Sequence, residues 1–242
     1  MNLIIGRKPV LEALSSGEVI EQIYVLFGQK SPAIYEIQKL ARQKGIKIVE
    51  LPQAKFSAIS QDPHTQGVIA IKSSQKYFEL DELIREAKKS PLPFLLVLDS
   101  IQDPHNLGAI IRSAECAGVD GIIVTKHNSA TVTETVVKTS AGATEHARIC
   151  KVSNLSQALK TLKEEGFWVM GSYLEGAKDY SETDYKLPLA LVVGNEEKGL
   201  RRLTAESCDF LIKIPMKGKI QSLNVSVATG VLLFEVLRQR SK

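Results

Sequence analysis

Polar residues that could do chemistry are concentrated in three segments of the second half of the chain. The first, 99–108, reads DSIQDPHNLG and leads into a predicted helix that carries Arg112. The second, 194–200, reads GNEEKGL. The third, 214–230, runs from a strand end through a basic loop into a helix rich in small residues. Active sites of α/β proteins lie where strands end, so the three segments together predict one site.

Each residue type in these segments also has a purely structural interpretation. Asn106 and Ser222 are favoured N-cap residues, and Arg112 could lie on a solvated helix face. Gly194 would let a ligand approach the backbone closely, whereas Glu196 could simply belong to a polar turn. One segment alone leaves both interpretations open, and the presence of all three favours a functional site.

Several classes of α/β enzyme lack support in the sequence. No two of the 16 glycines are separated by a single residue, and no pair five apart is followed by Lys. This argues against a dinucleotide-binding Rossmann fold and a P-loop. The four histidines are scattered and no metal-binding spacing occurs, so we expect no metal. The three cysteines lie far apart and are predicted to be reduced core residues.

The composition predicts a cytoplasmic protein of two domains. The chain has 242 residues, 44% hydrophobic and 24% charged, and no apolar run approaches the ~20 residues of a membrane helix. The start lacks the features of a secretory signal. The net charge is +4, and residues 1–75 hold nine Lys/Arg against six Asp/Glu. This excess is too small to establish a nucleic-acid partner by itself.

Residues 1–75 predict a small α/β domain. Ser31-Pro32 is a good helix start, and Gly45 ends that helix. The other predicted elements are a helix at 7–14 and strands at 22–26, 46–51 and 67–71. Residues 76–93 have no long apolar run and are predicted to be a linker with a short amphipathic helix at 79–89.

Residues 94–242 predict a second, larger domain. Unbroken apolar runs, typical of strands buried on both faces of a parallel sheet, occupy 94–98, 122–124, 167–170 and 189–193. Helices are predicted at 107–117, 132–139, 155–165 and 223–238. This alternation indicates an α/β fold with a mostly parallel sheet and helices on both faces.

The three segments resemble the three motifs of the SpoU/TrmH family of RNA ribose 2′-O-methyltransferases, part of the SPOUT superfamily. The matching positions are DPxNLGxxxR at 103–112, GNExxGL at 194–200 and IPMxGxxxSLNVSVA at 214–228. The likeness covers about residues 94–242. The N-terminal unit resembles the family's substrate-binding domain, of the L30e/L7Ae ribosomal-protein type, through GxxxVxEAL at 6–14 and HxQG at 64–67.

The resemblance implies a fold feature, a cofactor and an assembly. The fold feature is a deep trefoil knot, which periodicity cannot reveal. The cofactor is S-adenosyl-L-methionine, bound within the knot by Gly194, Ile214, Met216 and Leu223. Members of the family pair as homodimers through the C-terminal domain. The small residues of 224–230 are compatible with such close packing.

The resemblance also implies roles for five residues in catalysis. Arg112 would bind an RNA phosphate and polarise the 2′-oxygen, because an unaided arginine is a poor base. Asn106 and Glu196 would orient Arg112 or the ribose, and Ser222 and Asn224 would hold the loop and the substrate. Whether Arg112 serves its own subunit or a partner's site stays open.

The expected partner is RNA, contacted by Arg7 and Lys8 at the start of the first helix. The whole chain most resembles the family members that methylate a guanosine in the peptidyl-transferase loop of 23S rRNA. A tRNA or another rRNA site remains an alternative substrate. A different class of function is a non-catalytic RNA-binding protein of ribosome assembly.

Overall fold

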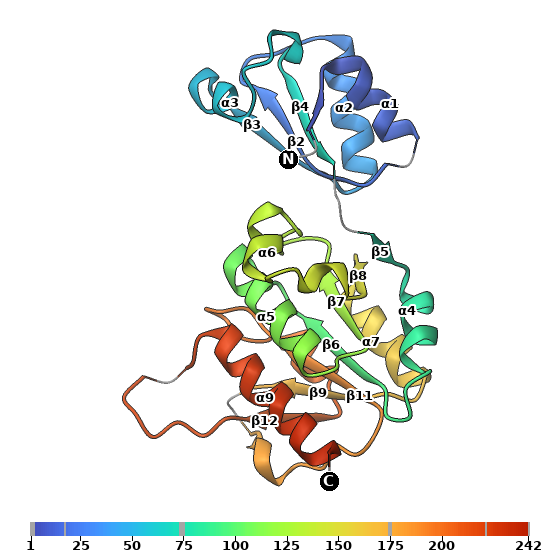
Figure 1. Ribbon diagram of the computed structural model, residues 1–242, viewed down its shortest axis with the longest axis vertical. Coiled ribbons are helices and arrows are strands. Elements are labelled where there is room, and N and C mark those ends of the chain that lie inside the picture. The colour runs from blue at the N-terminus through green and yellow to red at the C-terminus, as the bar shows by residue number, and fades with distance from the viewer. Residues whose placement is uncertain (1–2, 17, 73–75, 174–175, 221, 242) are drawn as a thin grey trace. The chain divides into compact units, whose positions relative to one another are not determined.

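The computed structural model describes residues 3–16, 18–72, 76–173, 176–220 and 222–241 (Figure 1). The chain divides into two compact units. The first comprises Met1–Lys76 with Val132–Glu134, and the second Tyr77–Thr131 with Thr135–Lys242. Among the helices of these described ranges, none is long and apolar enough to cross a membrane.

The smaller unit is a four-stranded sheet packed against helices. Its strand order is β1-β4-β2-β3, with β2 and β3 parallel and the other neighbours antiparallel. The strands are β1 (Leu3–Ile5), β2 (Ile20–Leu26), β3 (Lys47–Leu51) and β4 (Val68–Lys72). The helices are α1 (Arg7–Ser15), α2 (Pro32–Gln43), α3 (Gln53–Ile59) and the 3-10 turn Pro63–Thr65.

Helix α2 begins as its sequence predicts. The side chain of Ser31 accepts a hydrogen bond from the backbone N–H of Ile34 at 3.3 Å, and Pro32 occupies the first turn. Gly45, with φ of 63°, follows the end of the helix. The face of α2 that carries Ile34 and Ile37 is fully buried in the core of this unit.

The larger unit is built on an eight-stranded parallel sheet. Its order is β10-β12-β9-β11-β6-β7-β8-β5, and every neighbouring pair is parallel. The strands are β5 (Tyr77–Phe78), β6 (Phe94–Leu98), β7 (Gly121–Thr125), β8 (Ile149–Val152), β9 (Trp168–Ser172), β10 (Lys178–Asp179), β11 (Leu189–Val193) and β12 (Phe210–Lys213). Strands β6 and β11 are buried along their whole length, as the unbroken apolar runs predict.

Helices cover both faces of this sheet, which confirms the predicted α/β class. They are α4 (Leu80–Ala87), α5 (Pro104–Cys116), α6 (Glu134–Thr139), α7 (Leu155–Glu164), α8 (Arg202–Glu206) and α9 (Val225–Arg240), with 3-10 turns at Ala143–Glu145 and Tyr180–Glu182. On one face, Leu83 of α4 and Leu159 of α7 form a core with Val97 and Val192 of the sheet. Helices α5 and α9 pack together on the other face (Figure 1).

The segment 76–93, predicted as a linker, is largely part of the larger unit. Tyr77 of β5 pairs with Ile149 of β8, and α4 lies within the predicted helical range 79–89. The apolar side chains of α4, those of Leu83, Ile84 and Ala87, are buried in the core. The helix therefore belongs to the sheet that it covers, because its apolar face needs that partner.

The strand order requires the connection between β11 and β12 to pass another strand of the sheet. Strand β11 lies between β9 and β6, whereas β12 lies on the far side of β9. The chain must therefore pass β9 between β11 and β12. This order is compatible with the trefoil knot that the resemblance implies, and the threading itself stays a prediction.

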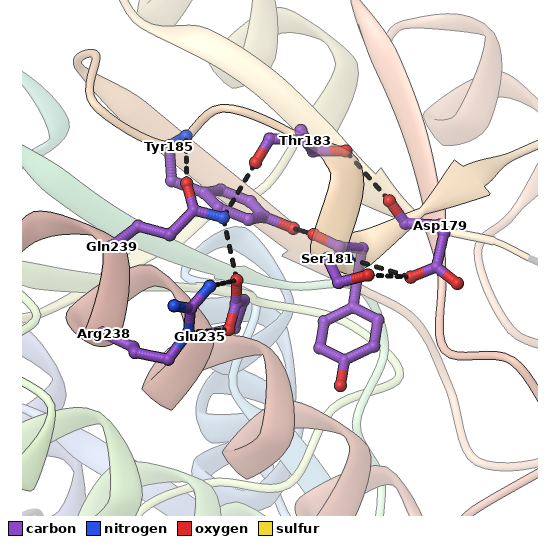
Figure 2. Close-up of polar contacts among 8 residues, drawn as sticks. Asp179, Ser181, Thr183, Tyr185, Glu235, Arg238 and Gln239 are labelled. Atoms are coloured by element: carbon purple, nitrogen blue, oxygen red, sulfur yellow. Dashed lines mark hydrogen bonds and ion pairs between the residues drawn. The ribbon is translucent and has the colours of Figure 1, made fainter.

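Hydrogen bonds attach the C-terminal end of α9 to the segment that contains Thr183 and Tyr185, just before β11 (Figure 2). Gln239 accepts a hydrogen bond from the backbone N–H of Tyr185 at 3.3 Å and donates to the carbonyl of Thr183 at 3.0 Å. The ring of Tyr185 is fully buried. The guanidinium of Arg240 donates to three carbonyls at 2.7–3.0 Å, those of Leu92, Tyr185 and Leu187. The last turn of α9 is thereby tied to chain segments far away in sequence.

Substitution of Arg240 tests this attachment. We expect Arg240→Ala to lower the free energy of unfolding by about 2–4 kcal/mol, because three part-buried carbonyls are deprived of a charged donor. Arg238→Ala is the matched control, since this arginine is exposed and, among the residues that the structure describes, pairs with Glu235 on the same helix alone. That control should change stability by less than about 1 kcal/mol. Urea denaturation of both variants measures the difference, and equal effects would contradict the assignment.

Candidate active site

The first two polar segments meet because they follow neighbouring strands. Strand β6 lies beside β11 with Leu98 opposite Val193. The backbone N–H of Asp99 donates to the carbonyl of Val193 at 2.8 Å. The loops that begin at residues 99 and 194 therefore leave the same edge of the sheet side by side.

A chain of side-chain hydrogen bonds joins all three polar segments. Asn106 donates from Nδ2 to Oε1 of Glu196 at 3.1 Å. Asn224 in turn donates from Nδ2 to Oδ1 of Asn106 at 3.0 Å. One residue from each segment takes part, although Asn106 and Asn224 lie 118 positions apart. Three of the five residues predicted to be catalytic are thus brought together.

The helix caps leave the side chain of Asn106 and the Nδ2 of Asn224 available for these contacts. Asp103, rather than Asn106, caps α5 by accepting from the N–H of His105 at 2.7 Å. Asn224, rather than Ser222, caps α9, with Oδ1 accepting from the N–H of Ser226 at 2.9 Å. The interpretation of Asn106 and Ser222 as N-caps is therefore wrong. Asn224 both caps α9 and contacts Asn106.

Asn195, which the sequence analysis did not single out, organises the second loop. Its Nδ2 donates to the carbonyl of Ser100 and to Oε2 of Glu196, both at 2.9 Å. Its backbone pairs with that of Gly199 at 2.9 and 3.0 Å, closing the loop into a tight turn. Gly199 has φ of 65°, a left-handed conformation that favours glycine.

Asp99, the first residue of the first loop, binds Arg201, which directly follows the second loop. The side chain of Asp99 is fully buried, and Oδ1 lies 2.7 Å from Nε of Arg201. The hydroxyl of Ser100 donates to the same carboxylate at 3.0 Å. Ser100 itself has φ of 66°, which is rare for a residue with a side chain. The ion pair of buried Asp99 with the exposed Arg201, and the unusual backbone of Ser100, fix the position of the carbonyl that holds Asn195.

Gly194 is required by the fold of the chain itself. A Cβ atom at this position would lie 2.2 Å from backbone atoms of both Gly199 and Leu200. Glycine here lets the loop fold back on itself, a reason that involves no ligand. Contact between Gly194 and a cofactor stays a prediction.

Arg112 and Ser222 lie outside the hydrogen-bonded chain. Arg112 follows Asn106 by six residues on α5, so the two side chains diverge by about 120° around the helix axis. The side chain of Arg112 is exposed and, within the ranges that the structure describes, has no hydrogen-bond or ion-pair partner. Ser222 is likewise exposed.

The predicted cofactor residues Ile214, Met216 and Leu223 lie on the irregular segment between β12 and α9. Ile214 and Met216 are half-buried, and Leu223 is 38% exposed. In the part of the chain that the structure describes, the backbone of Met216 makes no hydrogen bond. Apolar side chains and free amide groups therefore lie together on this segment.

Two of the three cysteines have unreactive thiols, whereas Cys116, predicted as a core residue, is exposed. Burial raises the pKa of Cys150 and of Cys208 to about 12, so both thiols stay protonated and unreactive at neutral pH. No group of three His, Cys, Asp or Glu residues in the described ranges could hold a metal ion.

Arg7, predicted to contact RNA, also has a structural role. It donates from Nε to the carbonyl of Gln66 at 2.9 Å and from Nη2 to Oε1 of Gln29 at 2.8 Å. These bonds tie the start of α1 to two turns of the smaller unit. Lys8 is exposed. Contact of either residue with RNA stays a prediction.

Comparison with known families assigns both parts of the chain. Residues 93–234 match the SpoU rRNA methylase family, and residues 3–78 match the substrate-binding domain of RNA 2′-O ribose methyltransferases. The chain therefore belongs to the SpoU/TrmH family of RNA methyltransferases. Its site belongs to a class of enzymes that methylate the ribose of tRNA or rRNA.

Relatives extend over the whole chain. It is 41% identical over 240 residues to a Staphylococcus saprophyticus protein named for the TrmH family of tRNA/rRNA methyltransferases, covering 99% of this chain and 96% of the relative. Bacillus subtilis YacO, named for the same family, is 41% identical over 239 residues, covering 98% and 96%. The AdoMet-bound rRNA methyltransferase of Sinorhizobium meliloti superposes with a TM-score of 0.63 at 29% identity, covering 98% of this chain and 86% of that one.

Gly194→Ala tests the tight turn of the second loop. We expect the free energy of unfolding to fall by about 2–4 kcal/mol, because the added methyl group collides with backbone that cannot rotate away. Gly218→Ala is the control, since an added Cβ atom there would come no closer than 4.0 Å to any atom beyond the adjacent residues, and its φ is not positive. Thermal unfolding compares the two variants. A Gly194→Ala protein as stable as the control would contradict the packing argument.

Proposed function

We propose that this protein transfers a methyl group from S-adenosyl-L-methionine to the ribose 2′-hydroxyl of a guanosine in the peptidyl-transferase loop of 23S rRNA. The observation that carries the proposal is the hydrogen-bonded chain from Asn224 through Asn106 to Glu196. It joins the three family motifs at one edge of the sheet. The choice of 23S rRNA rests on the resemblance of the whole chain.

The residues at this edge fit the cofactor. The methyltransferase of Sinorhizobium meliloti is described as AdoMet-bound, and it shares the fold over nearly the whole of this chain. An adenosine moiety needs amide donors and acceptors with apolar contacts. The backbone of Met216 and the side chains of Ile214 and Leu223 offer these groups. When bound, the cofactor supplies an electrophilic methyl group on a positively charged sulfur.

Arg112 is assigned to the substrate hydroxyl. The 2′-hydroxyl is a weak nucleophile and must lose its proton as it attacks. Arginine side chains stay protonated in proteins and are therefore poor bases, so we assign Arg112 to bind an RNA phosphate and polarise the 2′-oxygen. The phosphate, or a transiently neutral guanidine, accepts the proton. The exposed position of Arg112 suits contact with an incoming RNA.

Glu196 is assigned an orienting role rather than that of a base. Its Oε1 accepts from Asn106 and its Oε2 accepts from Asn195. Both oxygens are thus engaged, which fixes the direction of the carboxyl group. Asn106 and Glu196 orient the ribose or Arg112, while Ser222 and Asn224 hold the loop and the substrate.

A homodimer through the C-terminal domain is part of the proposal. Exposed apolar side chains follow one another along α9 and its start, those of Leu223, Val227, Phe234 and Leu237. Exposed apolar residues in helical spacing favour a protein–protein contact. Arg112 lies on α5, which packs against α9, so a dimer formed through α9 would bring a second subunit to the same pair of helices. Arg112 then serves its own site or that of the partner.

Two alternatives remain for the experiment to separate. The named relatives are tRNA/rRNA methyltransferases, so a tRNA or another rRNA site is the second candidate substrate. A non-catalytic role in ribosome assembly is the third candidate, and failure to bind S-adenosyl-L-methionine in calorimetry would favour it.

Arg112→Ala tests the assigned mechanism. We expect methyl transfer to fall by at least about a thousandfold, because a substrate-polarising charge is removed. The affinity for S-adenosyl-L-methionine should be unchanged, since Arg112 is not assigned to the cofactor. Arg85→Ala, another exposed arginine on a helix of the same unit, should keep full activity. Labelled-methyl transfer and calorimetry measure the two effects. Turnover like that of the unmodified protein would refute the role.

Mapping of the modified nucleotide tests the substrate. We expect the purified protein to methylate a fragment of 23S rRNA that contains the peptidyl-transferase loop, at one guanosine ribose. Deletion of the gene should remove that single 2′-O-methyl group from cellular rRNA. Loss of a methyl group from tRNA instead would replace the proposed substrate and keep the reaction.

A further inference from the structure

A cavity of about 430 Å³ lies at the carboxyl ends of β7 and β8 in the larger unit. Thr125 of β7, Ser153 after β8 and Arg201 at the start of α8 contribute to its wall. It shares no residue with the hydrogen-bonded chain of Asn106, Glu196 and Asn224. Its volume lies within the range of about 300–1,000 Å³ found for small-ligand sites. It is therefore large enough for a nucleotide.

The charge of the lining favours an anion. His127, Arg201 and Arg202 line the cavity, and the other polar lining residues carry hydroxyl or amide groups, as Ser153 and Asn154 do. Among the residues that the structure describes, no Asp or Glu lines it. Guanidinium and hydroxyl groups together are the usual partners of a phosphate.

Arg201 is held in a fixed position relative to the active site. Buried Asp99 binds its Nε at 2.7 Å and also accepts from its backbone N–H at 3.3 Å. Ser100, which follows Asp99 in the chain, accepts a hydrogen bond at its carbonyl from Nδ2 of Asn195 at 2.9 Å. Asn195 also donates to Glu196. A short series of contacts thus connects the cationic wall of the cavity with the proposed methyl-transfer site.

The rim of the cavity also offers apolar surface. Leu203 lines the cavity and is 66% exposed. Arg202 beside it has a side chain that is 86% exposed and, within the described part of the chain, pairs with Glu206 alone, one turn along α8. Cationic groups next to an exposed apolar side chain match a nucleotide, which presents a phosphate and a flat ring.

We propose that this cavity is a second RNA subsite, which holds the phosphate of a nucleotide flanking the methylated one. Arg201, Arg202 and His127 bind the phosphate, and Leu203 contacts the adjoining sugar or base. The inference rests on the proposed function, since the RNA must also reach the methyl-transfer site. It adds a place where the neighbouring nucleotide is gripped, separate from the residues assigned to catalysis.

The double variant His127→Ala/Arg202→Ala tests the subsite, because both side chains are exposed and neither is assigned to catalysis. We expect the Kd for an rRNA fragment to rise about tenfold, and the slope of log Kd against log salt to fall by about 0.7 for each phosphate that is no longer neutralised. The affinity for S-adenosyl-L-methionine should not change, because neither residue is assigned to the cofactor. Filter binding measures Kd without any need for turnover.

Lys160→Ala is the matched control. Lys160 forms an exposed i,i+4 pair with Glu164, as Arg202 does with Glu206, but it does not line the cavity. Its removal should leave the Kd within about twofold, because an exposed ion pair contributes little. A tenfold effect in this control too would show a general charge effect and overturn the subsite.

Replacement of one RNA phosphate at a time by an uncharged methylphosphonate shows which phosphate the subsite binds. We expect the unmodified protein to bind more weakly when one phosphate flanking the methylated nucleotide is replaced, and the double variant to show no further weakening there. Equal Kd and salt slope for the double variant and the unmodified protein would overturn the subsite. Absence of methylation by the unmodified protein, with these binding differences intact, would instead refute the proposed function alone.

Discussion

The site depends on the hydrogen bonds that connect three loops through Asn106. Its amide is both donor and acceptor, so it holds Glu196 on one side and Asn224 on the other. Removal of one partner would leave a part-buried polar group unpaired, at a cost of about 1–3 kcal/mol. Each loop is therefore positioned by the other two. This mutual support is possible only because β6 and β11 are neighbours in a parallel sheet.

Burial on both faces explains which strands the sequence predicts well. The bounds predicted for β6 and β11 agree with the structure, because a strand covered on both sides is apolar at every position. The two-residue strands β5 and β10 have no such pattern, and only the strands they pair with reveal them. The amphipathic helix α4 was predicted, but its packing against the sheet was not. The apolar face of a helix does not indicate which other element it packs against.

The sequence likewise predicts some residues of the candidate site and misses others. The residue types around 106, 196 and 224 predict a shared site, and the structure joins them. Asp99 and Asn195 were missed because their partners lie about a hundred positions away, as in the pairing of Asp99 with Arg201. A local signal for the cap of α5 was available, because Asp103 followed by Pro104 is a strong helix start. That signal leaves Asn106 free for another role.

The contrast between fixed and free groups bears on how the site would select RNA. Glu196 and Asn106 are engaged before any substrate arrives, whereas Arg112 is exposed and unpartnered among the described residues. Ordering a free arginine side chain costs up to about 2 kcal/mol of rotamer entropy, which a phosphate contact can offset. The constellation proposed for methyl transfer is then complete only when an RNA phosphate is present. A free nucleoside, which lacks that phosphate, would leave Arg112 disordered and the 2′-oxygen without its polarising charge.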